Sequence, residues 1–399
     1  MNVLFRGLTV IAVSYSSCSG IPSNQRNTSH WVHNAVFISD SRLELLRKRI
    51  SEKTEPTFSA WKVVGPACDR GLLQKPRAVG RWAIPGYYEN KDRHEAAVLP
   101  LQADSTLAYE EALCFRLTGK TKYAAQSIRI INAWSSTLRS SDPTQADSKL
   151  SMCEFFPTMI AAAGLLRPYG DWSNGSREQF KTLLRKVVLP LNTMDTKKNN
   201  HANWGTLLVL SVATFLDDLQ LLEKAEVRFK SLIDTQISAD GTLPLEIDRS
   251  DSKVTHGGAT RGKRGIWYTN YALMPTTLSA EILSINGHSL YEYRSPAGGS
   301  LKSAYERVAD WCLHPEAFPY YGLNHGKLKG TNYVSYFEIL DILWPNSAAH
   351  AMLEKYRPLT ADGSFPLLTL THGGIGPENV AGANSPTNGE ALRHFFTRR

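Results

Sequence analysis

The sequence predicts an all-α protein, specifically an (α/α) toroid, or incomplete α/α barrel, built from helical hairpins. Apolar residues recur at spacings of three and four along most of residues 40–355. Several of these stretches come in pairs joined by short turns that contain glycine. Strand-like patterns are few, and "YVSYFEIL" can be interpreted equally well as a helix. Repeated hairpins favour helix pairs that curl around a central cleft, and a bundle of unrelated helical domains is the alternative.

The first clear hairpin is "DSTLAYEEALCFRLTGKTKYAAQSIRIINAWS". Asp104 or Ser105 is expected to cap its first helix, and Gly119 to end it before the second helix begins. The segment "REQFKTLLRKVVLPL" begins the next pair. Further helices are predicted in "GTLLVLSVATFLDDLQLLEKAEVRFKSLI", "LMPTTLSAEILSIN" and "LKSAYERVADWCL".

Irregular segments are expected between these helices, and binding residues concentrate in loops carried by a rigid scaffold. The expected irregular segments are 66–103, 138–150, 249–267, 292–300, 313–332 and 358–399. No linker rich in proline or serine divides the chain, so residues 21–399 are predicted to form a single domain.

The N-terminal stretch "MNVLFRGLTVIAVSYSSCSG" places Arg6 before a short apolar run and a row of small residues. This layout is typical of a secretory signal, so residues 1–20 are predicted to be a signal peptide and the protein to be secreted or periplasmic. A lipid-bearing Cys18 is the alternative. Four other cysteines remain, and their spacing leaves three disulfide connectivities open. They are Cys68, Cys114, Cys153 and Cys312.

Net charge and motifs limit the partners of the protein. A net charge of +8 favours an acidic partner. The chain has no nucleic-acid-binding motif, and an exported protein seldom meets nucleic acid, so an acidic polysaccharide is expected. There is no HExxH motif and no paired histidine and carboxylate spacing, so neither a metal nor another cofactor is expected. Apolar runs are shorter than the roughly 20 residues of a membrane span. We also expect a monomer.

The stretch "KNNHANW" gathers polar side chains at the start of a predicted helix. Asn199, Asn200, His201 and Asn203 would lie in its first turn, followed by Trp204. One interpretation is that the amides cap the free N–H groups of the helix. Capping explains one or two amides, whereas a carboxylate seated at the helix N-terminus would explain more of the cluster.

Two later segments add an arginine and two tyrosines. In "DGTLPLEIDRS", Arg249 follows Asp248, and such a pair is ordinarily a surface ion pair. In "IWYTNYALMP", Tyr268 and Tyr271 are three residues apart and therefore share one face of a helix start. Taken singly, these tyrosines would be core residues with one polar end.

Together, "KNNHANWGTLLVLSVAT", "DGTLPLEIDR" and "YTNYAL" resemble the core of the alginate lyases of polysaccharide lyase family 5 and their relatives. The similarity covers roughly residues 85–285. An upstream piece, "YYENKDRHEAAV", resembles the family's loop with a basic substrate-binding residue, a place that Arg93 or Lys91 would occupy.

The resemblance implies roles for these residues. Asn200 and His201 would contact the uronate carboxylate and reaction centre, Arg249 would support the catalytic tyrosine or the sugar acid, and Tyr268 would act as general base and acid. Substrate-binding roles are expected for a second set of residues, namely Asn199, Asn203, Trp204, Tyr271, Arg264 and His256, besides Arg93 and Lys91. A tyrosine has an ordinary pKa of about 10, so a nearby cation such as Arg249 is needed to lower it.

The implied reaction removes the C5 proton of a 4-linked uronan and expels the C4 oxygen without water. One residue can serve as base and acid only when both groups lie on the same side of the ring. β-D-Mannuronate and β-D-glucuronate meet this condition, whereas α-L-guluronate is inverted at C5. The implied substrate is therefore polymannuronate or glucuronan.

The chain departs from the family in "SDSKVTHGGATRGKRGIW", a longer and more basic connection between Arg249 and Tyr268. It would be either a lid over a polyanion or a solvated surface insertion. Its length also leaves open whether Arg249 or Arg264 is the functional arginine.

Two other classes of function remain open. A glycoside hydrolase on a helical toroid would need two carboxylic acids, for which Glu246, Asp248 and Asp251 are candidates. A protein that binds acidic polysaccharide without turnover is the other alternative.

Overall fold

The computed structural model describes residues 35–252, 255–360 and 364–379. It confirms the all-α prediction, because strands among these residues are limited to β1 (Arg81–Trp82) and β2 (Ser140–Ser141). The two strands pair in parallel, with Arg81 opposite Ser140. The predicted signal peptide, residues 1–20, lies outside the described residues.

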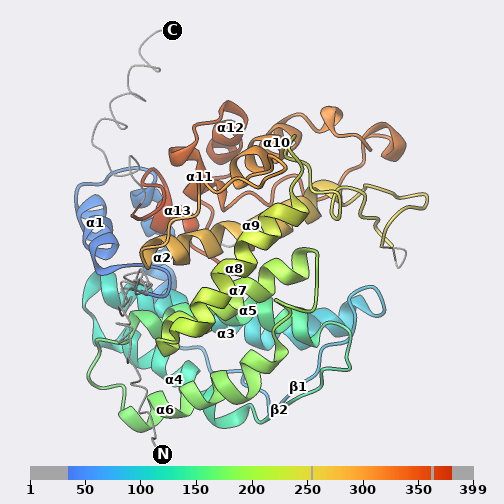
Figure 1. The fold of residues 1–399 in the computed structure, drawn as a ribbon. Coiled ribbons are helices and arrows are strands. Elements are labelled where there is room, and N and C mark those ends of the chain that lie inside the picture. The colour runs from blue at the N-terminus through green and yellow to red at the C-terminus, as the bar shows by residue number, and fades with distance from the viewer. Residues whose placement is uncertain (1–34, 253–254, 361–363, 380–399) are drawn as a thin grey trace, which may run out of the picture. The chain divides into compact units, whose positions relative to one another are not determined.

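The helices follow one another along the chain in the order shown in Figure 1. Short π and 3-10 turns, labelled η, separate some of them. The elements are α1 (Asp40–Ser51), α2 (Thr57–Gly71), α3 (Lys91–Thr118), α4 (Thr121–Thr137), α5 (Ser148–Leu165), α6 (Asn174–Leu183), η1 (Leu184–Val188), η2 (Leu189–Leu191), α7 (Asn200–Leu216), α8 (Leu219–Gln236), α9 (Gly265–Ile285), α10 (Leu301–Leu313), η3 (Pro315–Ala317), η4 (Gly322–Asn324), α11 (Phe337–Leu343), α12 (Ser347–Tyr356) and α13 (Leu368–His372).

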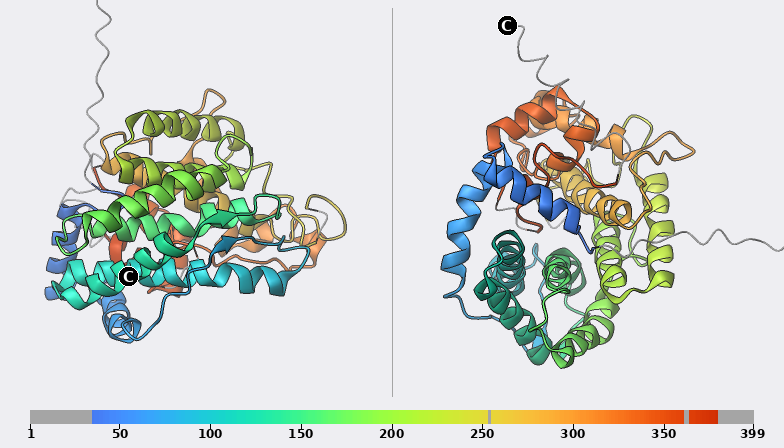
Figure 2. Two further views of the ribbon diagram at one scale, coloured as in Figure 1. Left: turned by 90° about the horizontal axis from the view of Figure 1, so that it is seen from below. Right: turned by 90° about the vertical axis from the view of Figure 1, so that its left-hand side faces the viewer.

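Alternate helices form two rows. Helix α5 packs between α3 and α7, and α7 packs in turn against α9. Helices α4, α8 and α10 pack against α3, α7 and α9, respectively. Figure 2 shows this succession of helix pairs, several of them nearly end-on. The arrangement is that of an α/α toroid, in which one helix of each hairpin is inner and the other is outer.

The amino-acid pattern explains which helices are inner. Helices α5, α7 and α9 are apolar on nearly all sides, and almost all their residues are buried. Helices α4, α8 and α10 bury one face and leave polar residues on the other. Because a helix that is apolar all round can lie only in the interior, this difference assigns each helix to its row.

The expectation that residues 66–103 are irregular was wrong at both ends. Helix α2 runs to Gly71, and α3 begins at Lys91, with the side chain of Asn90 accepting from the N–H of Arg93 at 3.0 Å. Asp104 therefore lies inside α3 and does not cap it. Its buried carboxylate accepts from the N–H of Arg77 at 2.6 Å and from Trp134 Nε1 at 2.8 Å. These distant partners satisfy a residue that local preference alone would place at a helix end.

Other predicted boundaries hold. Gly119 ends α3 with a φ of 73°, and "LKSAYERVADWCL" coincides with α10. The ambiguous "YVSYFEIL" forms a turn that leads into α11. No helix within the described ranges is long and apolar enough to cross a membrane.

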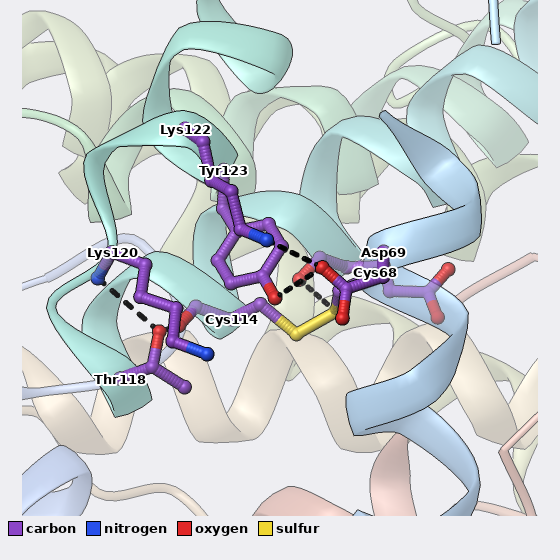
Figure 3. The surroundings of a disulfide bond; sticks show 8 residues. Cys68, Asp69, Cys114, Thr118, Lys120, Lys122 and Tyr123 are labelled. Atoms are coloured by element: carbon purple, nitrogen blue, oxygen red, sulfur yellow. Dashed lines mark hydrogen bonds and ion pairs between the residues drawn. A yellow bond between two sulfur atoms is a disulfide. The ribbon is translucent and has the colours of Figure 1, made fainter. Parts of the chain in front are cut away.

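One disulfide joins the first two long helices of the chain, resolving the connectivity that the sequence left open. Cys68 of α2 is bonded to Cys114 of α3, whereas Cys153 and Cys312 are buried free thiols. Figure 3 shows Asp69 beside this bond, where it accepts from Lys122 Nζ at 2.6 Å and from the hydroxyl of Tyr123 at 2.9 Å. The same region therefore also ties the start of α4 to α2.

Replacing Cys68 and Cys114 together by serine should destabilise the fold. The bond closes a loop with a sequence separation of 46 residues. Its loss restores loop entropy to the unfolded chain and should lower the free energy of unfolding by about 4 kcal/mol. Urea unfolding of both proteins measures the difference. Reductant should lower the midpoint of the wild type and leave the double variant unchanged; equal midpoints without reductant would contradict the prediction.

Candidate active site

The carboxylate of Glu246 holds the first turn of α7. The backbone N–H of Asn200 donates to Glu246 Oε1 at 2.7 Å, and Asn200 Nδ2 lies 3.0 and 2.9 Å from the two carboxylate oxygens. The N-cap residue, Asn199, makes no side-chain cap bond. The interpretation that the amides cap this helix was therefore wrong: a carboxylate from a later segment does so, in the position where the helix dipole favours an anion.

Two glycines allow the helix starts to pack closely against backbone. A Cβ at Gly205 of α7 would lie 2.3 Å from the backbone nitrogen of Met194. At Gly265, the first residue of α9, a Cβ would lie 2.1 Å from the carbonyl oxygen of Ile247. Only glycine fits at such distances. Gly265 therefore brings the first turn of α9 against the segment that carries Arg249.

Asn203 and Trp204 are buried in the core, where they meet other protein groups. Asn203 Nδ2 donates to Gln236 Oε1 at 3.0 Å and to Thr276 Oγ1 at 2.8 Å, and Gln236 donates back. Trp204 is fully buried against Tyr271, with ring centroids 5.1 Å apart. The structure therefore does not bring these two side chains to a surface that a sugar could reach.

His201 is partly buried and neutral near pH 7. Burial lowers the pKa of its imidazole to about 4, with Lys197 and Arg249 acting in the same direction and Asp147 opposing them. The hydroxyl of Thr193 donates to its carbonyl oxygen. A neutral imidazole can donate one hydrogen bond and accept another, so His201 is able to orient a ligand without adding charge.

The side chain of Tyr268 contacts a second tyrosine through its hydroxyl and an arginine through its ring. Its hydroxyl is 2.9 Å from the hydroxyl of Tyr88, and the guanidinium carbon of Arg249 is 4.0 Å from the centroid of its ring. Arg249 is buried, and its Nε has no hydrogen-bond partner among the described residues. A buried cationic donor without a protein partner is well suited to an anion.

Burial and the arginine act on Tyr268 in opposite directions. Burial raises the pKa of the hydroxyl, Arg249 lowers it, and the contact with Tyr88 raises it further. The resulting pKa of Tyr268 lies above the ordinary value of a tyrosine. Arg249 therefore shifts the pKa of Tyr268 downward, as the sequence predicted. Burial outweighs this shift, so the hydroxyl is protonated at neutral pH.

Arg264 reaches the same group of tyrosines, so both candidate arginines lie at the site. Arg264 Nη1 donates to the hydroxyl of Tyr88 at 3.2 Å, and Nη2 lies 3.5 Å from that of Tyr87. Arg249 contacts the ring of Tyr268, whereas Arg264 contacts its neighbour. This division assigns the closer electrostatic influence on Tyr268 to Arg249.

The other predicted binding residues differ in exposure. Tyr271 is buried, and its hydroxyl donates to Glu154 at 2.6 Å. Lys91 and Arg93 are exposed on the first turn of α3, soon after Tyr88, and so lie on a helix instead of the expected loop. His256 is exposed, with Nδ1 2.5 Å from Asp248.

The structure adds residues that sequence reasoning did not assign to the site. Tyr88 belongs to "YYENKDRHEAAV", in which the sequence assigned a role only to Lys91 and Arg93. Asp147 accepts from the N–H of Tyr87 at 2.7 Å and lies 3.2 Å from His94 Nδ1, whose pKa is raised by that carboxylate despite burial. The only signal for His94 was its place in "YYENKDRHEAAV". Across the described ranges, no group of three or more histidine, cysteine or acidic residues is arranged to hold a metal ion.

Solved structures share this architecture. An alginate lyase from Bacteroides ovatus superposes with a TM-score of 0.64 at 15% identity, covering 85% of this chain and 98% of that one. Alginate lyase A1-III from Sphingomonas species A1 gives a TM-score of 0.65 at 16% identity, covering 85% and 97%. A tyrosine-to-phenylalanine variant of A1-III in complex with a tetrasaccharide gives a TM-score of 0.66 at 18% identity, covering 88% and 99%. The fold is therefore the α/α toroid of these lyases.

Sequence comparison goes further. The alginate lyase family profile matches residues 60–318, well over half of the sequence, and the chain belongs to this family. A polysaccharide lyase from Stenotrophomonas maltophilia strain K279a is 30% identical over 182 residues, covering 44% of this chain and 49% of that protein. An alginate lyase from Pseudomonas fluorescens strain SBW25 is 26% identical over 140 residues, covering 35% and 33%. The chain thus spans half or less of these two curated relatives.

Glu246 should make stability fall as the pH rises. Burial raises its pKa from 4.5 to about 7, so the folded protein releases this proton at a higher pH than the unfolded chain does. Its contribution is fully present below pH 4.5 and is lost as the pH rises through about 7, by about 3 kcal/mol at most. Glu246→Gln should remove this part of the pH dependence.

Urea unfolding of the wild type and Glu246→Gln at pH 5 and pH 8 checks this prediction. Relative to the wild type, the variant should have a higher free energy of unfolding at pH 8 than at pH 5. Glu246→Ala serves as a comparison, because it leaves the donors of Asn200 unsatisfied and should cost about 1–3 kcal/mol at both pH values. Parallel pH dependences for the wild type and the glutamine variant would show that Glu246 does not titrate as described.

Proposed function

We propose that the protein is a secreted polysaccharide lyase that needs no cofactor and cleaves a 4-linked β-D-uronan by syn β-elimination. Family membership supports a lyase, and an alginate lyase of the same fold has been solved with a tetrasaccharide. The disulfide between Cys68 and Cys114 supports an oxidising compartment. The substrate we propose is polymannuronate or glucuronan.

The reaction needs a base that takes a proton and an acid that gives one, and a single residue can serve as both. The proton leaves C5, its electron pair forms the C4=C5 double bond, and the C4–O bond breaks. Tyr268 receives the C5 proton in its phenolate form and returns a proton to the departing oxygen. The buried contact of the Tyr268 ring with Arg249, at 4.0 Å, is the observation that carries this assignment.

Charge that develops on the uronate carboxylate needs donors. Arg249 has a buried Nε without a protein partner in the described part of the chain, and His201 offers a neutral imidazole. Fixed donors of this kind stabilise an enolate-like transition state without having to reorganise. Because both carboxylate oxygens of Glu246 hold the amide nitrogen of Asn200, we assign Asn200 to positioning the first turn of α7.

The acids available for a hydrolase are poorly suited to that reaction. Glu246 is buried on Asn200. Asp251 has a pKa lowered by Lys329 and Arg264 against the effect of burial, so it is ionised at neutral pH and has no proton to donate. Asp248 is bound by His256. A general acid needs a raised pKa, and Asp251 lacks the environment that would provide one.

Ultraviolet absorbance tests the reaction type. Purified protein incubated separately with polymannuronate, polyguluronate and glucuronan should show the absorbance of a conjugated C4=C5 bond with one of the two β-D-uronans and none with polyguluronate. Tyr268→Phe should reduce the rate by about 10²- to 10⁴-fold. Tyr293→Phe removes an exposed hydroxyl that binds Asp234 and should retain activity. New reducing ends without the absorbance would instead mean hydrolysis.

The pH dependence of kcat/KM tests Tyr268 as the base. Because its pKa lies above the ordinary value, the phenolate is a small fraction of the enzyme at neutral pH. That fraction grows about tenfold per pH unit, so kcat/KM should rise about tenfold per unit, or roughly a hundredfold between pH 7 and 9. Arg249→Ala should shift the rise to a higher pH. A flat profile over this interval would exclude Tyr268 as the base.

A further inference from the structure

Four cationic side chains lie near two carboxylates, those of Asp248 and Asp251. Three of the cations belong to the segment between Arg249 and Tyr268, and the fourth, Lys329, belongs to a later segment that packs against it. Lys329 Nζ, Arg264 Nε and Lys263 Nζ lie 2.6, 3.0 and 3.7 Å, respectively, from the carboxylate of Asp251. Arg261 lies 3.8 Å from Asp248. We call Arg261, Lys263, Arg264 and Lys329 the basic rim.

The basic rim has more positive than negative charge. Its four cations share two carboxylates, Asp248 and Asp251, which leaves two positive charges in excess. The side chains of Arg261 and Lys329 are 48% and 49% exposed, whereas those of the two aspartates are 20% and 19% exposed. Arg261 and Lys329 therefore face solvent, whereas Lys263 and Arg264, at 27% and 16% exposed, lie about as deep as the acids.

Contacts from two segments hold the rim in place. The N–H of Lys329 donates to the carbonyl of Lys263 at 3.0 Å, and Asn324 Nδ2 donates to the carbonyl of Arg261 at 2.8 Å. The guanidinium of Arg261 lies 5.0 Å from the ring centroid of Tyr320. Cations that are already ordered lose little conformational entropy when they bind an anion. These contacts favour a fixed surface over a loose insertion.

The rim begins next to the proposed reaction centre. Arg264 donates to the hydroxyl of Tyr88, which is 2.9 Å from that of Tyr268. A 4-linked uronan carries one carboxylate on every sugar. A chain with one sugar at Tyr268 must therefore place further carboxylates on either side of that sugar.

We propose that the basic rim is an accessory subsite for the carboxylates of uronate residues beyond the one that reacts. This inference rests on the proposed function for its substrate class. The rim attracts a multiply charged chain more than a short fragment, so the protein favours longer polymers. Arg264 joins the subsite to the reaction centre, while Lys263 and Lys329 bind carboxylates farther along the chain.

The double variant Lys263→Gln/Lys329→Gln tests the subsite, since it keeps Arg264 and its contact with Tyr88. KM for a long uronan should rise roughly tenfold, with kcat within about twofold, because two partly screened charge contacts are lost. KM for the shortest oligomer that the wild type cleaves should change less than about twofold. Added salt should weaken the binding of polymer to the wild type more than to the variant.

A matched control removes two charges elsewhere. Lys120→Gln/Lys122→Gln lies beyond the C-terminal end of α3, and Tyr88 precedes its N-terminal end, so roughly 40 Å of helix separates the two places. If this control raises KM for the polymer as much as the rim variant does, net charge explains the effect and the subsite is refuted. Equal increases in KM for polymer and short oligomer would refute it as well.

Direct binding separates failure of the subsite from failure of the proposed function. Calorimetric titration of polymannuronate and glucuronan into the wild type, the rim variant and the control does not depend on turnover. Weaker binding in the rim variant alone supports the subsite even if no unsaturated product forms, in which case the lyase proposal alone fails. Unchanged binding in the rim variant overturns the subsite even if the wild type is an active lyase.

Discussion

The arrangement of the candidate site depends on the carboxylate of Glu246 at the N-terminus of α7. That carboxylate binds both the backbone N–H and the side-chain amide of Asn200. Three residues later in the same segment, Arg249 lies on the ring of Tyr268. One short stretch between α8 and α9 therefore sets where His201 and Tyr268 stand relative to each other.

Burial sets the protonation states in this region. It raises the pKa values of Glu246 and Tyr268 and lowers that of His201, so the uncharged form is favoured in all three cases. Positive charge at the site is therefore carried mainly by arginine, which does not lose its proton under ordinary conditions. An anionic sugar would meet fixed cations beside neutral hydrogen-bonding groups.

The charged groups outside the immediate site form ion pairs that are partly exposed to solvent. The two acids that pair with the basic rim are partly exposed; Asp251 is neutralised by three cations, whereas Asp248 pairs with Arg261 and His256. Exposed ion pairs contribute little to stability because water and salt screen them. Their structural effect is to order the segment between Arg249 and Tyr268, which makes it part of the scaffold around the tyrosines.

Much of the fold could be predicted from the sequence because the spacing of apolar residues is a local property. The pattern places α7, α9 and α10, and Gly119 marks a helix end through its backbone freedom alone. Tyr268 and Tyr271 were expected on one helix face because helical geometry brings residues three apart together. Asp104 was misplaced because its partners, Arg77 and Trp134, are distant in the chain.

The candidate site likewise combines features that the sequence predicted with features that only the tertiary structure decided. The resemblance of three sequence segments to the alginate lyases implied His201, Arg249 and Tyr268 as a set, and that assignment stays a prediction. Tertiary structure alone decided that Asn203 faces Gln236 in the core, that Tyr88 meets Tyr268, and that Glu246 caps α7. The physical reason is that local sequence determines helix propensity and helix faces, whereas burial and hydrogen-bond partners depend on which distant segments pack together.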